Sequence, residues 1–564
     1  MEFVSPYRHD GVLNPVERLK LDRHPLDVAL AVRERYARLG VEAIHAVEGE
    51  VERLKWVGIY PQRHGGDAFM LRIKVPAGQL RAAQLRRVGE IVQRFGAGPE
   101  EHPVWGNRYC DLTTRQDIQL HWVRIADVPR IWDLLEEVGI TTLQACGDSA
   151  RNVLCCPLSG LDADEVLDAA PVAAAISQFF TGNREYANLP RKFKLSVTGC
   201  REDCAQAEIN DVGLLPARHG DGTVGFNLRV GGGLSDGPRM ASDIDVFVRP
   251  EDAVEIARAI AQVFGELGNR ENRGFSRMRY LVQELGPEGF RAALAERARI
   301  PLEPAGESLT RRYRGDHVGV APERRPGLFS VGCSVTVGRL SGDDLVEIAR
   351  LAEEYGEGEV RLATDQNFIV TGVAETRLAA LCDEPLLARH SPFPGPFSRG
   401  VVACTGSEFC RFAIVETKVR AMRWADELDR RFAAAFGGPA GTRERDEADV
   451  VRMHFSGCSA SCAQPQIADI GFRGETAHRG DDLVEAVDIG LGGSLGADAA
   501  FGDWVIGALP VDEVPAALSA VVGRYLDERR GGERFHSWTR QRSAGELRQV
   551  LRPGELTSKE VAGR

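Results

Sequence analysis

The sequence predicts an internally duplicated α+β and α/β fold, with two ferredoxin-like half-domains and two mixed α/β domains related by a pseudo-twofold axis. Three pairs of similar segments predict the duplication. FMLRIKVPAGQL (69–80) is repeated as FSVGCSVTVGRL (329–340), DLTTRQDIQLHWV (111–123) as RLATDQNFIVTGV (361–373), and GCREDCAQAEINDVG (199–213) as GCSASCAQPQIADIG (457–471). A period this long indicates gene duplication, since solenoids repeat every 20 to 50 residues, roughly.

Taken in chain order, the predicted elements form two similar halves. The spacing of apolar residues predicts an amphipathic helix from Pro25 to Gly40 and another from Leu80 to Phe95, and alternation predicts a strand from Met70 to Val75. We therefore expect an N-terminal helical arm at 1–55, a ferredoxin-like half-domain at 56–140, an α/β domain at 141–301, an Arg/Pro-rich linker at 302–326, a second ferredoxin-like half-domain at 327–395 and a second α/β domain at 396–564.

Composition is that of a large globular protein. The chain has 564 residues, of which 43% are hydrophobic and 27% charged, and its formal net charge is −12. This charge argues against non-specific binding to nucleic acid. Because the N-terminus has no apolar signal region and no run of about 18 apolar residues occurs, we expect no membrane association and a reducing, cytoplasmic location.

Two pairs of cysteines carry the strongest chemical signal. ACTGSEFC (403–410) contains Cys404 and Cys410, and GCSASC (457–462) contains Cys458 and Cys462. Four thiolates are the ligand set of a [4Fe–4S] cluster. The alternatives are a structural zinc site, although a five-residue gap is at the edge of the usual zinc spacing, and four unrelated core cysteines.

These motifs, together with VETK (415–418) and AQPQIADIGF (463–472), resemble the cluster half of the sirohaem-containing sulfite and nitrite reductases. The resemblance implies that both α/β domains bind cofactors and that the cofactors are a [4Fe–4S] cluster and sirohaem. It also implies that Cys404, Cys410, Cys458 and Cys462 ligate the cluster, and that Cys462 additionally reaches the sirohaem iron.

The resemblance also assigns polar residues to the substrate and to sirohaem. Arg72, Arg151, Lys192 and Lys194 would surround the open face of the haem iron as catalytic residues. We expect Thr113, Arg115, Gln119 and His121 to contact sirohaem from one strand face, with Arg279, where relatives usually have Lys, in a similar role. Taken singly, such cations are usually solvated surface charges, and an isolated histidine is usually a hydrogen-bonded core residue.

The first half repeats part of the cysteine pattern. Aligning the repeats places Cys146 against Cys404, Asn152 against Cys410, and Cys200 and Cys204 against Cys458 and Cys462. The first half could hold a second metal site, with Cys155 or Cys156 as the missing ligand. The alternative is a degenerate copy whose thiols pack or line the cleft, which we favour because family members carry one cluster. Tyr60 and Cys146 fall near the expected cleft without an assigned role.

The implied reaction is a six-electron reduction, of sulfite to sulfide or of nitrite to ammonia. Lysine at position 194 is typical of sulfite reducers, whereas CTGSEFC, VETK and PQIADIGF are closer to nitrite reducers. We expect sulfite, with nitrite as the alternative. Ser459-Ala460 stands where relatives usually have Pro-Asn, which removes a possible hydrogen bond near the haem.

The electron donor is expected to be another protein. No GxGxxG motif follows a first strand, and VGGGLSDG lacks the spacing of a dinucleotide-binding turn. The resemblance points to ferredoxin, and an acidic ferredoxin could bind the linker arginines Arg311, Arg312, Arg314, Arg324 and Arg325, which are otherwise a solvated linker. Two other functions stay open: a precorrin-3B synthase-like oxygenase, and a non-enzymatic zinc-stabilised binding protein or electron carrier.

Overall fold

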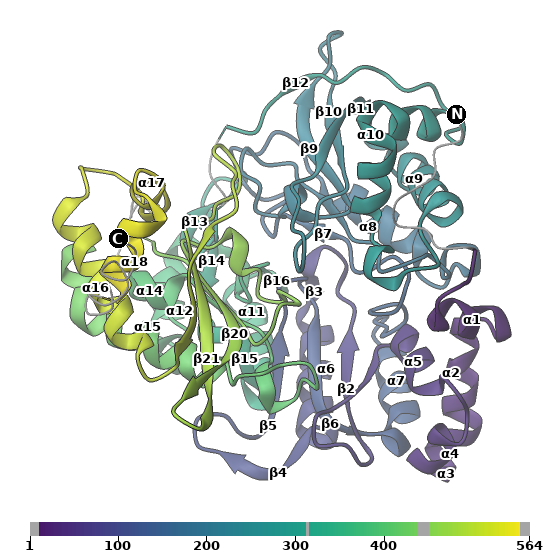
Figure 1. Ribbon diagram of the computed structural model, residues 1–564, viewed down its shortest axis with the longest axis horizontal. Helices are drawn as coiled ribbons and strands as arrows, with labels where there is room; N and C mark the ends of the chain where they lie inside the picture. The colour runs from purple at the N-terminus through teal and green to yellow at the C-terminus, as the bar shows by residue number, and fades with distance from the viewer. Residues whose placement is uncertain (1–10, 312–314, 437–449, 553–564) are drawn as a thin grey trace, which may run out of the picture.

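The computed structural model describes residues 11–311, 315–436 and 450–552. Arg312 and Arg314 of the predicted basic linker lie outside the described residues. Figure 1 shows the first α/β unit in teal at the top, the second in yellow-green at the left, and the N-terminal helices in purple at the lower right.

The N-terminal segment is a set of short helices packed on the first half. Tyr36 and Leu54 are buried in the same hydrophobic core as Leu71 of the first sheet. The indole Nε1 of Trp56 donates to the carbonyl of Ala187 at 2.7 Å, which ties this segment to the first α/β unit. The helices are α1 (Pro15–Asp22), α2 (Val28–Ala31), α3 (Ala37–Leu39), α4 (Val41–His45) and α5 (Glu50–Arg53).

Two central sheets correspond to the predicted ferredoxin-like half-domains, and each is completed by a strand from the other half. The first has the order β1 (Ile59–Pro61), β2 (Ala68–Ile73), β6 (Ile118–Arg124), β5 (Gly106–Leu112) and β15 (Arg339–Ser341), with β4 (Ala97–His102) beside β5. The second has the order β13 (Gly319–Pro322), β14 (Leu328–Cys333), β17 (Phe368–Ala374), β16 (Glu359–Leu362) and β3 (Gln79–Arg81). The exchange of β3 and β15 means that neither sheet is complete within its own half.

The helix that follows each exchanged strand packs against its counterpart. These helices are α6 (Ala82–Phe95) and α11 (Gly342–Tyr355). A Cβ atom at Gly89 would lie 2.8 Å from the carbonyl oxygen of Gly342, so the two backbones approach closely only because a glycine stands there. Further helices on these units are α7 (Val128–Glu136), α12 (Leu378–Cys382), α13 (Pro385–Arg389) and α14 (Pro396–Arg399).

The two α/β units have the same strand order, which confirms the predicted duplication. In each sheet the first three strands are parallel and the rest antiparallel. The first contains β7 (Leu154–Cys155), β8 (Leu195–Val197), β9 (Val212–Arg218), β10 (Val224–Val230) and β11 (Ser242–Val248), with β12 (Glu307–Ser308) beside β9 and helices α8 (Ala170–Phe180), α9 (Ala253–Leu267) and α10 (Met278–Ala295). The second contains β18 (Val401–Ala403), β19 (Met453–Ser456), β20 (Ile470–Arg479), β21 (Asp482–Leu491) and β22 (Asp503–Pro510), with α15 (Lys418–Phe432), α16 (Val514–Glu528), α17 (Phe535–Arg540) and α18 (Ala544–Leu551).

Strand register corrects the predicted alignment of the cysteines. Cys155 pairs with Val197 at the end of β7, and Ala403 pairs with Phe455 at the equivalent place in β18. The next residue in each half is therefore Cys156 and Cys404. The expected matches of Cys146 with Cys404 and of Asn152 with Cys410 are wrong, because ACG (145–147) precedes β7, whereas ACT (403–405) begins in the last residue of β18.

One glutamine in the first half joins both halves of the molecule. Gln116 is fully buried and has a left-handed backbone, with φ of 56°. Its amide Nε2 donates to the carbonyl of Cys155 at 3.0 Å and to that of Leu362 in the other half at 2.7 Å, while Oε1 accepts from the Cys155 amide at 3.1 Å.

Gln366 repeats this arrangement from the second half, with φ of 65°. Its Nε2 donates to the carbonyl of Ala403 at 3.0 Å and to that of Leu112 in the first half at 2.8 Å, and its Oε1 accepts from the Ala403 amide at 3.0 Å. The two side chains thus bind each α/β unit to the sheet of the opposite half.

Gln116→Leu is expected to lower the free energy of unfolding by about 2 to 4 kcal/mol, because it leaves buried backbone groups unpaired and places a larger apolar residue at positive φ. Chemical unfolding followed by circular dichroism measures the change. Gln541→Leu is the control, since the Gln541 side chain bonds only at an exposed position. Equal stability of both variants and the parent protein would contradict the role given to Gln116.

Candidate active site

The four predicted cluster cysteines follow two adjacent parallel strands. Cys404 directly follows β18, and only Gly457 separates Cys458 from the end of β19. Both cysteines therefore lie at the carboxyl edge of the sheet. The backbone amide of Gly457 donates to Cys404 Sγ at 3.2 Å. Cys462 is exposed, and its carbonyl accepts a hydrogen bond from the Thr114 hydroxyl at 3.0 Å. The structure therefore brings the cysteine loops of the second half against a turn of the first half.

Burial and mutual repulsion disfavour the thiolate form of these cysteines. Burial, followed by the charge of Cys462, raises the pKa of Cys404 to about 12. Burial also raises the pKa of Cys410, and that of Cys458 to about 11, with Cys462 again contributing. Four thiols brought to one edge of the sheet become thiolates when a positive centre binds them, and iron supplies such a centre. The donor set therefore fits an iron–sulfur cluster.

The four predicted catalytic cations lie around the same place. Arg72 comes from β2, and the backbone of Arg151 donates to the carbonyl of Phe193 at 2.8 Å, which places it beside Lys192 and Lys194. Burial is the larger influence on the pKa of both Arg72 and Lys192, but the charge of Cys462 acts on both, so the loop of Cys462 lies near these two cations. The pocket is thus positive on the first-half side and sulfur-rich on the other.

Both lysines are desolvated and surrounded by like charge. Burial, then Arg277 and Arg151, lowers the pKa of Lys192 to about 7. Burial, then Arg115 and Lys192, lowers the pKa of Lys194 well below its usual value. Among the described residues no carboxylate lies within ion-pair distance of either ammonium group. Such a site favours anionic ligands, because they restore the charge balance that the protein lacks.

Arg277 is a further cation beside Lys192 and Lys194, and it was not among the residues predicted from the sequence. Its Nη2 forms a buried ion pair with Asp211 at 3.0 Å, and Asp211 also accepts from the Lys194 amide at 2.9 Å. A Cβ atom at Gly233 would lie 3.1 Å from the Arg277 Nη2 atom. The signal in the sequence was the pair of arginines at 277 and 279, because the side chains of residues two apart can reach the same site.

The expectation of a single strand face for the sirohaem residues is wrong. Thr113 and Arg115 lie in the turn between β5 and β6, whereas Gln119 lies in β6, because the left-handed Gln116 reverses the chain between them. Gln119 accepts from Arg72 at 2.8 Å and donates to the Thr405 hydroxyl at 3.1 Å. Gln119 therefore holds Arg72 beside the cluster loop.

Arg115 is bound mainly to protein atoms of the first α/β unit. Its guanidinium donates to Asn210 Oδ1 at 2.9 Å and to the carbonyl of Asn152. The Thr113 hydroxyl accepts from the backbone amides of Arg115 at 3.2 Å and Asp117 at 3.1 Å. Both side chains shape the turn that carries Thr114.

His121 and Arg279 have protein partners as well. The Nε2 atom of His121 lies 2.9 Å from Asp111 Oδ2, and its ring stacks on Phe409 at 3.8 Å. Arg279 donates to the carbonyls of Leu234 and Asp236. The structure thus places His121 and Arg279 in internal networks, and their predicted contacts with sirohaem stay predictions.

Tyr60 and Cys146 line the cationic pocket. The Arg72 guanidinium lies 5.1 Å from the centre of the Tyr60 ring. Although burial opposes it, the charges of Arg151 and Arg72 lower the pKa of the Cys146 thiol, and the Tyr60 hydroxyl beside it contributes. Cys146 therefore belongs to the pocket and not to the thiol set of the first half.

The described linker arginines do not form an uncompensated basic patch. Arg311 pairs with Glu307 at 2.6 Å, and Arg324 pairs with Glu165 at 2.8 Å. Arg325 pairs with Glu357 at 2.7 Å. In the parts of the chain that the structure covers, no helix has the length and apolar character needed to cross a membrane.

Comparisons with known proteins identify the family. The model of the nitrite and sulphite reductase 4Fe-4S domain matches residues 146–302 and 395–559. The model of the nitrite/sulfite reductase ferredoxin-like half domain matches residues 60–99, 104–138 and 322–388. These matches cover most of both halves.

Similar proteins extend over nearly the whole chain. The assimilatory ferredoxin-dependent nitrite reductase of Haloferax mediterranei is 40% identical over 542 residues, covering 93% of this chain and 91% of that protein. The ferredoxin–nitrite reductase of Synechococcus elongatus is 39% identical and covers 90% and 95%. The structure of the Mycobacterium tuberculosis NirA protein superposes with a TM-score of 0.86 at 33% identity, covering 95% and 98%. The chain therefore belongs to the nitrite and sulphite reductase family, and this membership supports the oxidoreductase class and the two predicted cofactors, a [4Fe–4S] cluster and sirohaem.

Proposed function

We propose that this protein reduces nitrite to ammonia with electrons from reduced ferredoxin. The observation that carries the proposal is a group of cations, in which burial desolvates Arg72, Lys192 and Lys194, Arg151 lies beside the lysines, and the charge of Cys462 acts on Arg72 and Lys192. Relatives that match nearly the full chain are named ferredoxin-dependent nitrite reductases. Nitrite thus replaces sulfite as the preferred substrate.

The residues that would hold the cofactors are on both sides of the pocket. Cys404, Cys410, Cys458 and Cys462 would ligate the cluster, with Cys462 shared with the sirohaem iron. The cluster and sirohaem supply one-electron transfer and a metal on which the oxyanion is reduced. The cations of the first half would neutralise carboxylates of sirohaem and oxygens of the substrate.

The chain's own contribution to the reaction is charge and protons. Arg72 is oriented by Gln119 and Arg151 by two hydrogen bonds to the carbonyl of Gly147, so both guanidinium groups are held before substrate enters. Lys192, with its pKa lowered to about 7, can both hold a substrate oxygen and release a proton near neutral pH. Arginine cannot do the second, because it stays protonated.

Sulfite is a second candidate substrate, favoured by one observation. Lys192 and Lys194 flank Phe193, whose carbonyl accepts from the Arg151 amide, and sulfite carries more negative charge than nitrite near neutral pH. The additional cation stabilises a dianion more than a monoanion. Comparing the two substrates in one assay separates the candidates.

Ferredoxin would approach the exposed side of the cluster loop. Phe412 is 76% exposed and Arg411 is exposed beside it. Arg63 donates to the carbonyl of Ala413 at 2.7 Å, which fixes this loop against the first half. An apolar side chain between cations suits an acidic partner. A cytoplasmic location stays a prediction.

Lys194→Met is expected to retain both cofactors and to lower turnover by about 10²-fold, because it removes an amine that a bound anion would keep protonated and that could donate to a substrate oxygen. Absorption spectra and iron content check the cofactors, and steady-state reduction by methyl viologen radical checks the rate. Lys55→Met is the control, since Lys55 pairs with Glu52 in the N-terminal helices. Normal turnover of Lys194→Met would remove this lysine from the proposed chemistry.

Nitrite is expected to give a higher kcat/KM than sulfite in the parent protein, and Lys194→Asn is expected to raise the ratio further, since it weakens the hold on the more highly charged anion. Product assays for ammonia and sulfide with reduced ferredoxin measure both reactions. A parent protein that prefers sulfite would overturn the choice of nitrite while leaving the family intact.

Cys458→Ser is expected to lose the iron–sulfur cluster, because a serine hydroxyl is a poor replacement for a thiolate ligand. Acid-labile sulfide and iron, measured on anaerobically purified protein, report the loss. Cys382→Ser is the matched control outside the site, and it should keep the parent's values. Retention of the full cluster by Cys458→Ser would show that Cys458 is not a ligand.

A further inference from the structure

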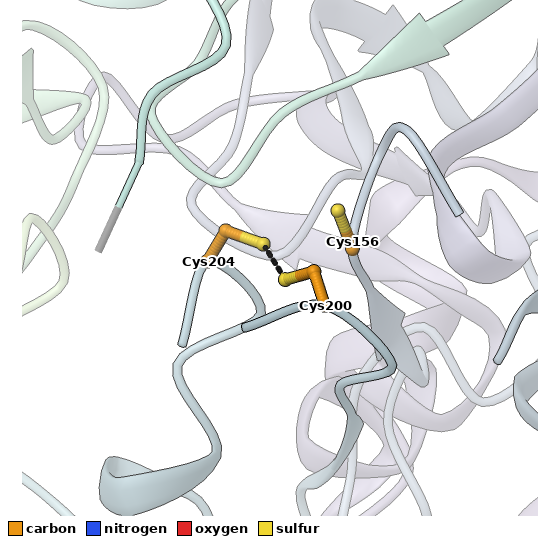
Figure 2. A group of neighbouring side chains, drawn as sticks. All are labelled: Cys156, Cys200 and Cys204. Atoms are coloured by element: carbon orange, nitrogen blue, oxygen red, sulfur yellow. Dashed lines mark hydrogen bonds between the residues drawn. The ribbon is translucent and has the colours of Figure 1, made fainter. Parts of the chain in front are cut away.

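A second group of thiols lies in the first half, away from the proposed cluster. Cys156, Cys200 and Cys204 are all buried, and their Sγ atoms lie within 4.8 Å of one another. Cys200 Sγ is 3.0 Å from Cys204 Sγ (Figure 2). Figure 2 shows Cys200 and Cys204 with their sulfurs turned toward each other, and Cys156 beside them on a separate segment.

This group occupies the place in the first half that the cluster cysteines occupy in the second. Cys156 follows β7 as Cys404 follows β18. The hydroxyl of Thr364 donates to the carbonyl of Cys204 at 2.9 Å, which repeats the bond from Thr114 to Cys462 at 3.0 Å. The scaffold that presents Cys404, Cys458 and Cys462 in the second half is therefore repeated around Cys156, Cys200 and Cys204 in the first.

The fourth ligand position differs between the halves. The amide of Cys410 donates to the carbonyl of Gly406 at 3.0 Å, and the amide of Asp162 donates to that of Leu158 at 2.9 Å at the equivalent turn. Asp162 thus stands where the second half has a thiol. Its carboxylate instead accepts from the Asp164 amide at 2.9 Å and is not part of the thiol group.

His317 offers a further donor on the Cys156 side, next to the group of three mutually close sulfurs but outside it. Its Nε2 atom lies 3.6 Å from Cys156 Sγ. The neighbouring residue Asp316 is buried and forms two bonds with Arg399, at 2.7 and 2.8 Å, which fix the segment. A Cβ atom at Gly332 would lie 1.8 Å from the His317 carbonyl oxygen, so only glycine lets the histidine backbone sit there.

The backbone of His317 lies in the left-handed region, which neighbouring contacts must stabilise. Its φ is 58°, which is uncommon for a residue other than glycine and costs about 1 kcal/mol or more. The Val318 amide donates to Asp316 at 3.0 Å, which closes the turn around it. The surrounding structure therefore holds the imidazole toward the thiols instead of letting the chain relax.

We propose that Cys156, Cys200, Cys204 and His317 bind one zinc ion. Three thiolates and an imidazole are a regular ligand set for tetrahedral structural zinc. The thiols converge on one point, which suits a single ion. By contrast, in the described chain no three of the second-half cysteine sulfurs lie within 4.8 Å of one another, and a cubane needs ligands spread around a cage.

The surroundings agree with a structural ion. Leu158, Ala321 and Ile369 are buried in one cluster with the three thiols. Leu158 belongs to the first half, and Ala321 and Ile369 to the second, so zinc here would fasten the segment that joins the halves. An apolar shell also keeps water and exchange partners from the metal.

Metal analysis tests the proposal without reference to catalysis. The complete protein, purified anaerobically from zinc-supplemented cells, is expected to contain about one zinc per chain besides its iron. X-ray absorption at the zinc edge is expected to show about three sulfur ligands near 2.3 Å and one nitrogen near 2.0 Å. Absence of zinc, iron in its place, or a Cys200–Cys204 disulfide seen by mass spectrometry would each overturn the proposal.

Substitutions assign the ligands. Cys200→Ser and His317→Ala are expected to lower zinc content by at least about tenfold while iron and acid-labile sulfide stay at parent values. Cys382→Ser should change neither metal, and Cys458→Ser should lose iron but keep zinc. Unchanged zinc in both Cys200→Ser and His317→Ala would overturn the assignment. If either variant does not fold, the zinc-edge measurement on the parent protein still decides, independently of the proposed nitrite reduction.

Discussion

The amide side chains of Gln116 and Gln366 are the constraint on which the arrangement of this molecule depends. Each is buried, each has a left-handed backbone, and each joins an α/β unit to the sheet of the other half. A buried amide with both ends bonded is specific, because a shift of either half would leave polar groups unpaired in the interior. The turns that contain these residues also present Thr114 to Cys462 and Thr364 to Cys204. Local backbone strain therefore sets the position of both thiol groups.

On this symmetric frame the two halves carry different chemistry. The second half supplies four separated thiols, whereas the first supplies the desolvated cations Arg72, Arg151, Lys192 and Lys194. Since positive and sulfur-bearing surfaces meet across the pseudo-twofold axis, neither half could form the proposed site alone. The exchange of β3 and β15 between the two central sheets holds the two halves in a fixed relative position. Duplication thus provided two copies of one scaffold, and divergence of side chains gave each a separate task.

The sequence predicted the duplicated fold and the cluster motif because both depend on short patterns of residue type. It could not predict the strand exchange, since β3 and β15 are three residues each and their partners are far away in the chain. The alignment of Cys146 with Cys404 failed because it relied on similar residue types. The correct alignment depends on the hydrogen-bond register of the strands, which only the structure gives. Thr113 and Arg115 were placed on a strand because alternation continues through the turn at Gln116, whose positive φ leaves no mark in residue type. His317 lies far from the thiols in the sequence, and no recognisable metal-binding motif includes it.

The electrostatics of the pocket tie ligand binding to the stability of the fold. Burial raises the pKa of Asp117 to about 6, and Asp117 and Asp211 are the carboxylates that face the pocket cations. Burial, and then the charges of Arg277 and Arg151, lower the pKa of Lys192, so desolvation and like-charge repulsion both disfavour its protonated form. An anion that binds only the folded chain relieves this repulsion and stabilises the protein in proportion to its affinity. An anionic cofactor would therefore stabilise the folded protein. A small oxyanion would likewise bind where its negative charge offsets that of the surrounding cations.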